Sequence, residues 1–163
     1  GYHYGAGDRA AVGRAGWAAF WIGMAFVGIS AGAMLLAPRQ IISLYIDVEN
    51  PANALMIGFA LQYLVVAAAF QLVDGAQAVA AGMLRGIQDT QMPAAIAIVS
   101  YWLFGFAGAY WLAFHTALSG LGVWIGLATG LTVAAILLMW RWMGRDRFGL
   151  LPRTAFPSQE TVA

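Results

Sequence analysis

The chain has 163 residues, of which 62% are hydrophobic and only 9% charged, and its formal net charge is +1. A soluble domain carries about 25% charged residues because water must wet its surface. The composition therefore predicts an integral membrane protein with the lipid bilayer as its partner. It also argues against a nucleic-acid partner, which would require a basic surface.

The chain contains no lysine and no cysteine. These absences exclude a Walker-type phosphate loop, a Schiff-base nucleophile and thiol chemistry within the chain. The only acid inside the apolar segments is Asp74, so a catalytic pair of carboxylates would need a second acid from elsewhere. We expect neither enzymatic activity nor an organic cofactor.

Four apolar segments are long enough to cross a bilayer, for which about 20 residues suffice. We therefore expect an all-α fold with four transmembrane helices. Asp8 and Asn50 are expected to be the N-caps of the first and second helices, with Pro51 as the first helical residue of the second. Residues 38–47 are predicted to form a short interfacial segment. The expected spans are residues 15–37, 52–84, 93–114 and 120–140, with a loop at 1–14 and a tail at 143–163.

The arginines are distributed unequally between the two sides that four alternating spans define. Seven of the eight fall on the side that carries both chain ends, and only Arg39 falls on the other. Basic loops resist translocation. This distribution predicts that residues 1–14 and 143–163 are cytoplasmic.

Small residues recur at four-residue intervals in the first and fourth spans, at Gly28 and Gly32 and from Gly122 through Gly126 to Gly130. Such spacing favours close helix packing in lipid, where apolar side chains gain little by leaving the bilayer. Tryptophans near the span ends, among them Trp142, are interpreted as an interfacial belt.

Asp74 is the most informative position of the sequence. It lies 11 residues before Arg85, or about 16 Å along a helix, which places it near the middle of a hydrocarbon core about 30 Å thick. A charge at that depth costs on the order of 3 kcal/mol. Water, a bound cation, a proton or a polar partner must compensate this cost.

The helical period places four side chains on one face, with Gln71 beside them. They are Tyr63, Phe70, Asp74 and Gln77. A carboxylate flanked by amides and aromatic rings suits a site that exchanges a proton or a metal ion such as Na⁺. The alternative is a structural aspartate held by hydrogen bonds from another helix.

Two further polar or aromatic motifs are expected to be structural. Arg85 and Asp89 stand four residues apart in the loop after the second span and are predicted to form a local ion pair. Tyr101 and Trp102 are interpreted as core packing in preference to substrate contact.

Several motifs together resemble multidrug and toxic compound extrusion (MATE) transporters of the NorM type. The stretch from Gln71 to Pro93 is similar to their tenth helix and the following loop. Ser100-Tyr-Trp102 resembles their eleventh helix, and Gly120-Leu-Gly-Val-Trp-Ile-Gly126 the start of their twelfth. The quoted motifs are Gln71-Leu-Val-Asp74-Gly-Ala-Gln77, Gly82-Met-Leu-Arg-Gly86, Asp89-Thr90 and Pro93.

The resemblance implies a twelve-helix transporter of the bacterial inner membrane with two lobes. It implies export of small cationic, aromatic drugs by alternating access in exchange for Na⁺ or H⁺. On this reading the chain is a fragment with four helices of the C-terminal lobe, and its partners are the N-terminal lobe and the first helices of its own lobe. The resemblance places Asp74 at the coupling-cation site, with Phe70 where some members carry a tyrosine.

Two alternatives remain open at the level of sequence. A flippase for lipid-linked sugars from the same superfamily would require an arginine-lined cavity. A small four-helix membrane assembly subunit would be complete in itself.

Overall fold

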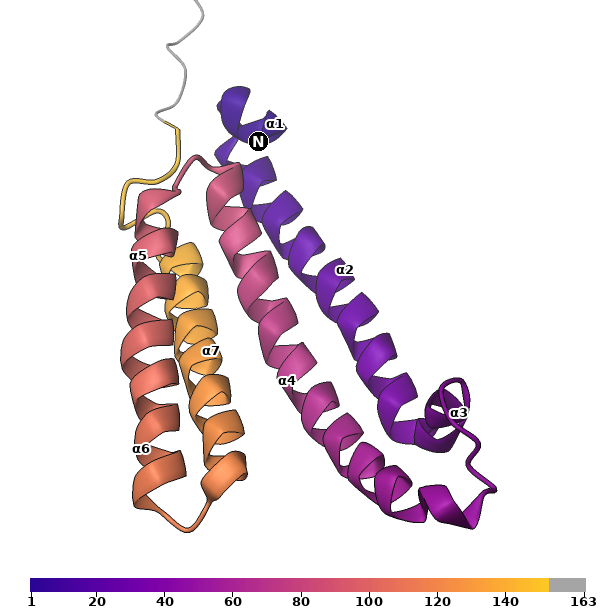
Figure 1. Ribbon diagram of the computed structural model, residues 1–163. Coiled ribbons are helices and arrows are strands. Elements are labelled where there is room, and N and C mark those ends of the chain that lie inside the picture. Colours follow the sequence, from indigo (N-terminus) through magenta and orange to yellow (C-terminus); the bar gives the residue numbers. More distant parts are fainter. Residues whose placement is uncertain (153–163) are drawn as a thin grey trace, which may run out of the picture.

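The computed structural model describes residues 1–152, and every regular element within them is a helix (Figure 1). Four helical segments are long and apolar enough to cross a membrane, which confirms the expected all-α architecture with four spanning helices. Residues 153–163 of the expected tail lie outside the described part. The four segments are Arg9–Leu36, Pro51–Gly86, Gln91–His115 and Ser119–Met143.

The first spanning helix, α2 (Arg9–Leu36), follows the short helix α1 (Tyr2–Gly5). Asp8 is its N-cap, as expected, because the Asp8 carboxylate accepts a hydrogen bond of 2.9 Å from the backbone N–H of Ala11. This contact satisfies one of the amides that every helix start leaves without a partner. The short helix α3 (Pro38–Ser43) then occupies the segment expected at the interface.

The second spanning segment begins at the 3₁₀ turn η1 (Pro51–Asn53) and continues as α4 (Ala54–Gly86). Asn50 caps its start through a 3.0 Å hydrogen bond from the N–H of Ala52. After α4, the residue Gln88 adopts a left-handed φ of 64°, and the N–H of Asp89 donates to the carbonyl of Leu84 at 3.0 Å. This arrangement ends the helix in a tight, internally bonded turn.

The third spanning segment, expected as one uniform helix, contains three helical parts. These are α5 (Gln91–Val99), the π-helical segment η2 (Ser100–Phe106) and α6 (Ala107–His115). A π-helical turn is rare and often marks a functional site. The last spanning helix is α7 (Ser119–Met143).

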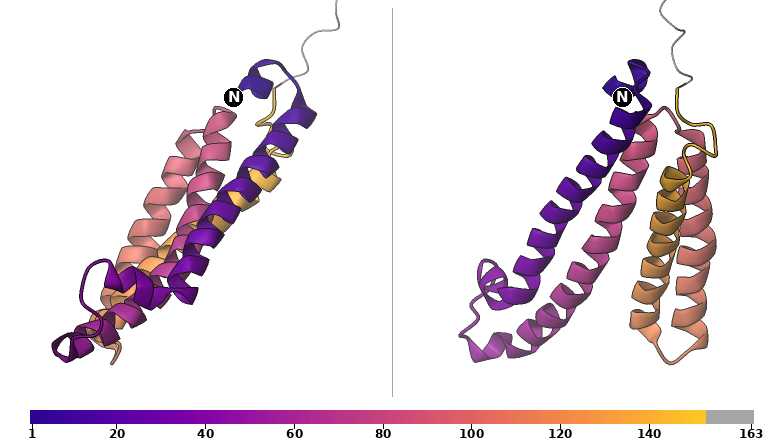
Figure 2. Two further views of the ribbon diagram at one scale, coloured as in Figure 1. Left: turned by 90° about the vertical axis from the view of Figure 1, so that its right-hand side faces the viewer. Right: turned by 180° about the vertical axis from the view of Figure 1, so that it is seen from behind.

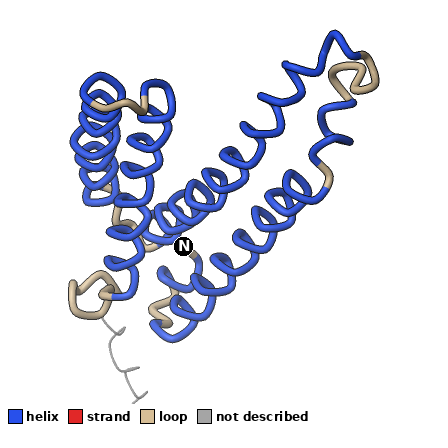
Figure 3. The backbone as a smooth tube through the Cα atoms, turned by 90° about the horizontal axis from the view of Figure 1, so that it is seen from below, coloured by secondary structure: helices blue, strands red, loops and turns tan. Residues whose placement is uncertain are grey.

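The four spans form two side-by-side pairs, α2 with α4 and the α5–α6 rod with α7 (Figures 1 and 2). The pairs approach each other at the end that carries the N-terminus and diverge towards the other end, as Figure 3 shows from below. We call the first the arginine-rich end, made of residues 1–14, 85–90 and 141–152. The opposite end comprises α3, η1 and the turn at residues 116–118.

The packed core lies at the arginine-rich end, where α2, α4 and α7 converge. Trp142 and Leu84 are its largest fully buried side chains. Trp142 is thus a core residue, and its interpretation as part of an interfacial belt was wrong. The buried cluster consists of Val12, Ala80, Ala81, Met83, Leu84, Ile87, Leu138, Trp142 and Leu151.

The glycines of α7 form a close seam with the third span, as their spacing predicted. A Cβ on Gly122 would lie 2.7 Å from the carbonyl carbon of Leu112, and one on Gly130 would lie 2.6 Å from the Cα of Gly105. Gly28 and Gly32 make no such close contact within residues 1–152, because a Cβ on either residue would have no atom of another helix within 4 Å.

The tight contacts between α2 and α4 are made by other glycines. A Cβ on Gly23 would lie 2.7 Å from a methyl group of Val79, and one on Gly75 would lie 2.7 Å from a methyl group of Val27. Valine methyls therefore fill the space that these two glycines leave.

Candidate functional site

Asp74 lies in the continuous helix α4, 12 residues before its last residue, Gly86. At 1.5 Å per residue this is about 18 Å from the arginine-rich end of the helix. The Asp74 side chain is exposed in this chain. Among residues 1–152 it has neither an ion-pair partner nor a side-chain hydrogen bond. Residues 1–152 therefore supply no charged partner for this carboxylate.

Tyr101 and Trp102 both belong to the π-helical segment η2 of the third span. Tyr101 is the second residue of the π-helical segment η2 and is partly exposed. Its neighbour Trp102 is exposed. The expectation that both residues pack in a core is thus not met within the described residues.

Tyr63 and Phe70 of α4 line a crevice between α4 and α7. The ring of Phe70 packs edge-on against Trp124 of α7, with 6.1 Å between the ring centroids. A cavity of about 330 Å³ beside this contact includes Phe70 and Val73 in its lining. A second cavity of about 340 Å³ is lined by Tyr63 and Trp124. Aromatic side chains from two helices thus surround this crevice.

Gln77, on the predicted face, and Gln71, beside it, differ in their roles. The Gln71 amide donates to the carbonyl of Val27 at 3.3 Å, so it joins α4 to α2. Gln77 is partly buried on α4, one turn beyond Asp74 towards the arginine-rich end. Gln71 therefore helps to position the helix that carries Asp74.

The predicted ion pair between Arg85 and Asp89 was wrong. Asp89 binds Arg141 at the end of α7, with the Arg141 Nε 2.5 Å from Oδ2 and the Nη2 3.1 Å from Oδ1. Arg85 is exposed and makes no ion pair within residues 1–152. The turn after Gly86 directs the Asp89 side chain towards α7, so the ion pair joins this turn to α7 and does not form between residues four apart.

Sequence reasoning missed Arg141 as a functional candidate. One signal was available, since the arginine count places Arg141 and Asp89 on the same side of the membrane. Opposite charges at the ends of neighbouring spans are candidates for pairing. The rule that oppositely charged residues four apart pair on one helix favoured Arg85 as the partner of Asp89 instead.

No group of three acidic or histidine side chains close enough to hold a metal ion occurs in residues 1–152. Asp74 alone supplies one carboxylate. A Na⁺ ion, which takes oxygen ligands, would therefore need hydroxyl, amide, carbonyl or water oxygens besides this carboxylate.

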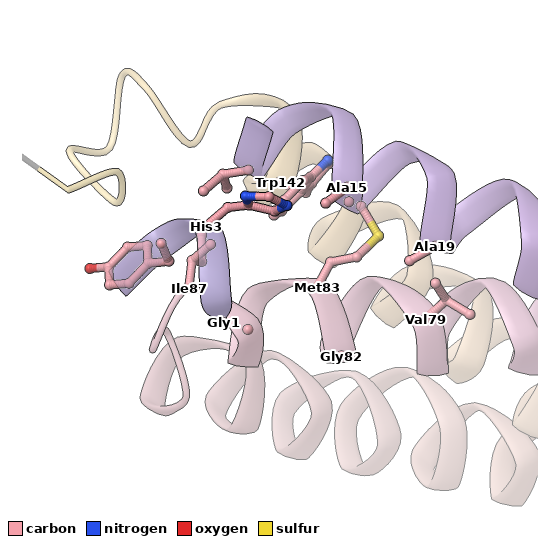
Figure 4. Close-up of a pocket in the computed structure, with 13 residues that line it drawn as sticks. Gly1, His3, Ala15, Ala19, Val79, Gly82, Met83, Ile87 and Trp142 are labelled. Carbon is pink, nitrogen blue, oxygen red and sulfur yellow. The ribbon is translucent and has the colours of Figure 1, made fainter. Parts of the chain in front are cut away.

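Another cavity, of about 400 Å³, lies at the arginine-rich end between α1, α2 and α4 (Figure 4). Its lining is mostly apolar and includes Met83, Val79, Trp142 and the imidazole of His3. No carboxylate lines it, so it offers no counter-charge to a cation.

Comparison with known proteins identifies a family and several relatives that match this chain. The profile of the MatE family matches residues 1–111. The "Probable multidrug resistance protein NorM" of Mesorhizobium japonicum is 50% identical over 156 residues, which is 96% of this chain and 33% of the relative. The "Multidrug resistance protein NorM" of Burkholderia vietnamiensis is 46% identical over 141 residues, 86% of this chain and 30% of the relative.

A more distant relative shows the same coverage. The "Probable multidrug resistance protein NorM" of Deinococcus radiodurans is 40% identical over 145 residues, 89% of this chain and 32% of that protein. The chain thus spans about a third of the length of these relatives.

Proposed function

Because this chain belongs to the MatE family, we propose that it forms four helices of a multi-pass exporter that moves small cationic, aromatic drugs out of the cell. The exporter would have twelve helices in two lobes and would alternate between inward-open and outward-open states. Inward movement of Na⁺ or H⁺ would drive export. The relatives named as multidrug resistance proteins support the drug-exporting role.

The observation that supports ion coupling most strongly is the state of Asp74. This carboxylate lies at membrane depth, is exposed in this chain and has no charged partner in residues 1–152. A midplane acid is costly and is seldom retained without a role in ion or substrate movement. Asp74 would therefore bind the coupling ion.

The coupling step follows from competition at one carboxylate. A proton or a Na⁺ ion on Asp74 neutralises the charge that a cationic drug would otherwise find there. Loading the ion thus weakens the attraction for the drug, while loss of the ion restores it. A ligand shifts a conformational equilibrium only by its differential affinity for the two states, and this competition supplies such a difference.

The crevice between α4 and α7 supports a contact with aromatic cations. Tyr63, Phe70 and Trp124 present aromatic rings from two helices around it. A cation over an aromatic face gains roughly 0.5–2 kcal/mol, most when water is excluded. We assign these rings to drug binding and Asp74 to the ion.

The alternative, a flippase for lipid-linked sugars, finds no support in the charge pattern. Its anionic substrate would require interior arginines. Every arginine in residues 1–152 lies at one end or the other of the spanning helices, with Arg39 at the opposite end and the rest at the arginine-rich end.

The arginine distribution also supports an orientation. Six of the described arginines lie at the arginine-rich end, so we place this end in the cytoplasm of a bacterial inner membrane. Both the start of the described chain and the segment after α7 would then face the cytoplasm.

The test is drug efflux by the full-length transporter in vesicles, under a Na⁺ gradient and under a H⁺ gradient applied separately. Asp74→Asn removes the charge with little change of shape, and we expect it to abolish export under the effective gradient. Asp47→Asn, an exposed acid at the opposite end, is the matched control and should leave export unchanged. Undiminished export by Asp74→Asn at equal membrane abundance would refute the coupling role.

A further inference from the structure

The two helix pairs are joined at the arginine-rich end by an ion pair that is largely shielded from solvent. The guanidinium of Arg141, at the end of α7, makes two hydrogen bonds to the carboxylate of Asp89 in the turn after α4. The side chains of Arg141 and Asp89 are only 14% and 9% exposed. A two-pronged contact of this kind fixes orientation as well as distance.

The position of Asp89 within its turn is also well defined. Its own N–H is bonded to the carbonyl of Leu84, and that of Gln88 donates to the carbonyl of Arg85 at 2.9 Å. The carboxylate therefore moves with the end of α4. Because Arg141 belongs to the regular part of α7, the ion pair transmits the position of one helix directly to the other.

Contacts from α2 reinforce the same end. The ring of Trp142 lies against Gly16, and the Arg145 guanidinium stacks over that ring at 4.8 Å from its centroid. Arg145 also lies beside Gly13, where a Cβ would be 2.8 Å from its Nη2. Residues 141–145, at and just after the end of α7, thus contact both α2 and the turn after α4.

The opposite end of the same two pairs is packed differently. Two cavities of about 330 and 340 Å³ separate α4 from α7 there. The edge-on contact between Phe70 and Trp124 is the aromatic bridge across this crevice. The buried core does not extend into this half. The V-shaped divergence of the pairs follows this difference in packing (Figure 1).

We propose that Asp89 and Arg141 form a clasp that keeps the two helix pairs together at the arginine-rich end while the pairs pivot and change their separation at the opposite end. Breaking a buried ion pair leaves an uncompensated charge, so the clasp resists separation far more than an exposed pair does. The proposal concerns movement within these four helices and does not depend on the role of Asp74.

The test uses pairs of spin labels in the full-length protein, reconstituted in lipid nanodiscs, with cysteines outside this chain replaced. The chain itself contains no cysteine, so each introduced cysteine is the only labelling site at its position. One pair, Arg85→Cys with Met143→Cys, reports on the arginine-rich end. The other, Tyr63→Cys with Leu121→Cys, reports on the opposite end. All four positions are exposed.

We expect a narrow distance distribution at the arginine-rich end and a broader one at the opposite end. Asp89→Asn should widen the distribution at the arginine-rich end about twofold by removing the charge from the clasp. The control is Asp146→Asn, which breaks the ion pair between Arg9 and Asp146. The side chains of Arg9 and Asp146 are 44% and 62% exposed, so this change should alter neither distribution.

A second variant guards against simple loss of folding. Arg141→Lys keeps the positive charge but loses the two-pronged geometry, so it should give an intermediate width in a protein with unchanged helical content. The proposal is overturned if the two ends of the unmodified protein show equal widths. It is also overturned if Asp89→Asn folds and leaves the arginine-rich end as narrow as before.

Discussion

The indole ring of Trp142, near the end of α7, lies directly against the backbone of Gly16 in α2. A Cβ on Gly16 would lie 2.5 Å from the Cη2 atom of the ring and 3.1 Å from its Cε2 atom. Only 1% of Trp142 is exposed. The first and last spans therefore meet through a ring that requires a glycine opposite it.

Gly16→Ala should destabilise the protein, because the added methyl group collides with a large ring that is enclosed by other core residues. Overpacking of this kind costs about 1–3 kcal/mol. Thermal unfolding in detergent, followed by circular dichroism, measures the effect. Gly28→Ala on the same helix is the control, since its methyl group would enter open space and should leave the midpoint nearly unchanged. Equal midpoints for the two variants would contradict the contact.

Gly126→Ala tests the close approach of α6 and α7. A Cβ at Gly126 would overlap the backbone of Ala109, so the two helices must move apart to accept it. Helix association in lipid depends on such close packing, and we expect a loss of about 1–3 kcal/mol. The matched control Gly120→Ala lies near the start of the same helix, with no atom close to its Cβ. Equal unfolding midpoints for the two variants would refute the seam.

The sequence predicted the four spans because each one combines a long apolar run with a recognisable start or end. Asp8 and Asn50 were recognisable as caps because a cap is a local contact between residues two or three apart. The glycine seam of α7 was also predictable, since three glycines at four-residue spacing share one helix face. Asp74 was found because a charge is conspicuous in an apolar segment.

Contacts between distant residues were harder to predict. Asp89 has a possible partner four residues away, Arg85, and another 52 residues away, Arg141, and only the folded turn after α4 distinguishes them. The π-helical segment after Val99 has no compositional signature. Gly28 and Gly32 have the same four-residue spacing but no close neighbour within residues 1–152. Small residues permit close helix packing, but their spacing does not determine whether another helix packs against them.

Asp8→Ala should remove the cap of α2 and lower stability by about 1 kcal/mol, because the N–H of Ala11 then loses its acceptor at a helix start. Asp8→Asn retains an acceptor oxygen and should stay close to the unmodified protein. Chemical unfolding of the two variants in parallel measures the difference. A fall of the same size in both variants would mean that the charge, and not the hydrogen bond, stabilises the helix.

The proposed orientation predicts which ends react with a membrane-impermeant maleimide added to intact cells. Tyr45→Cys, at the opposite end and 83% exposed as tyrosine, should be labelled. Gln88→Cys, exposed in the turn after α4, should be labelled only after the cells are permeabilised. The physical reason is that the arginines at the arginine-rich end, where Gln88 lies, resist translocation. Labelling of Gln88→Cys in intact cells, with Tyr45→Cys protected, would reverse the orientation and place the clasp outside the cell.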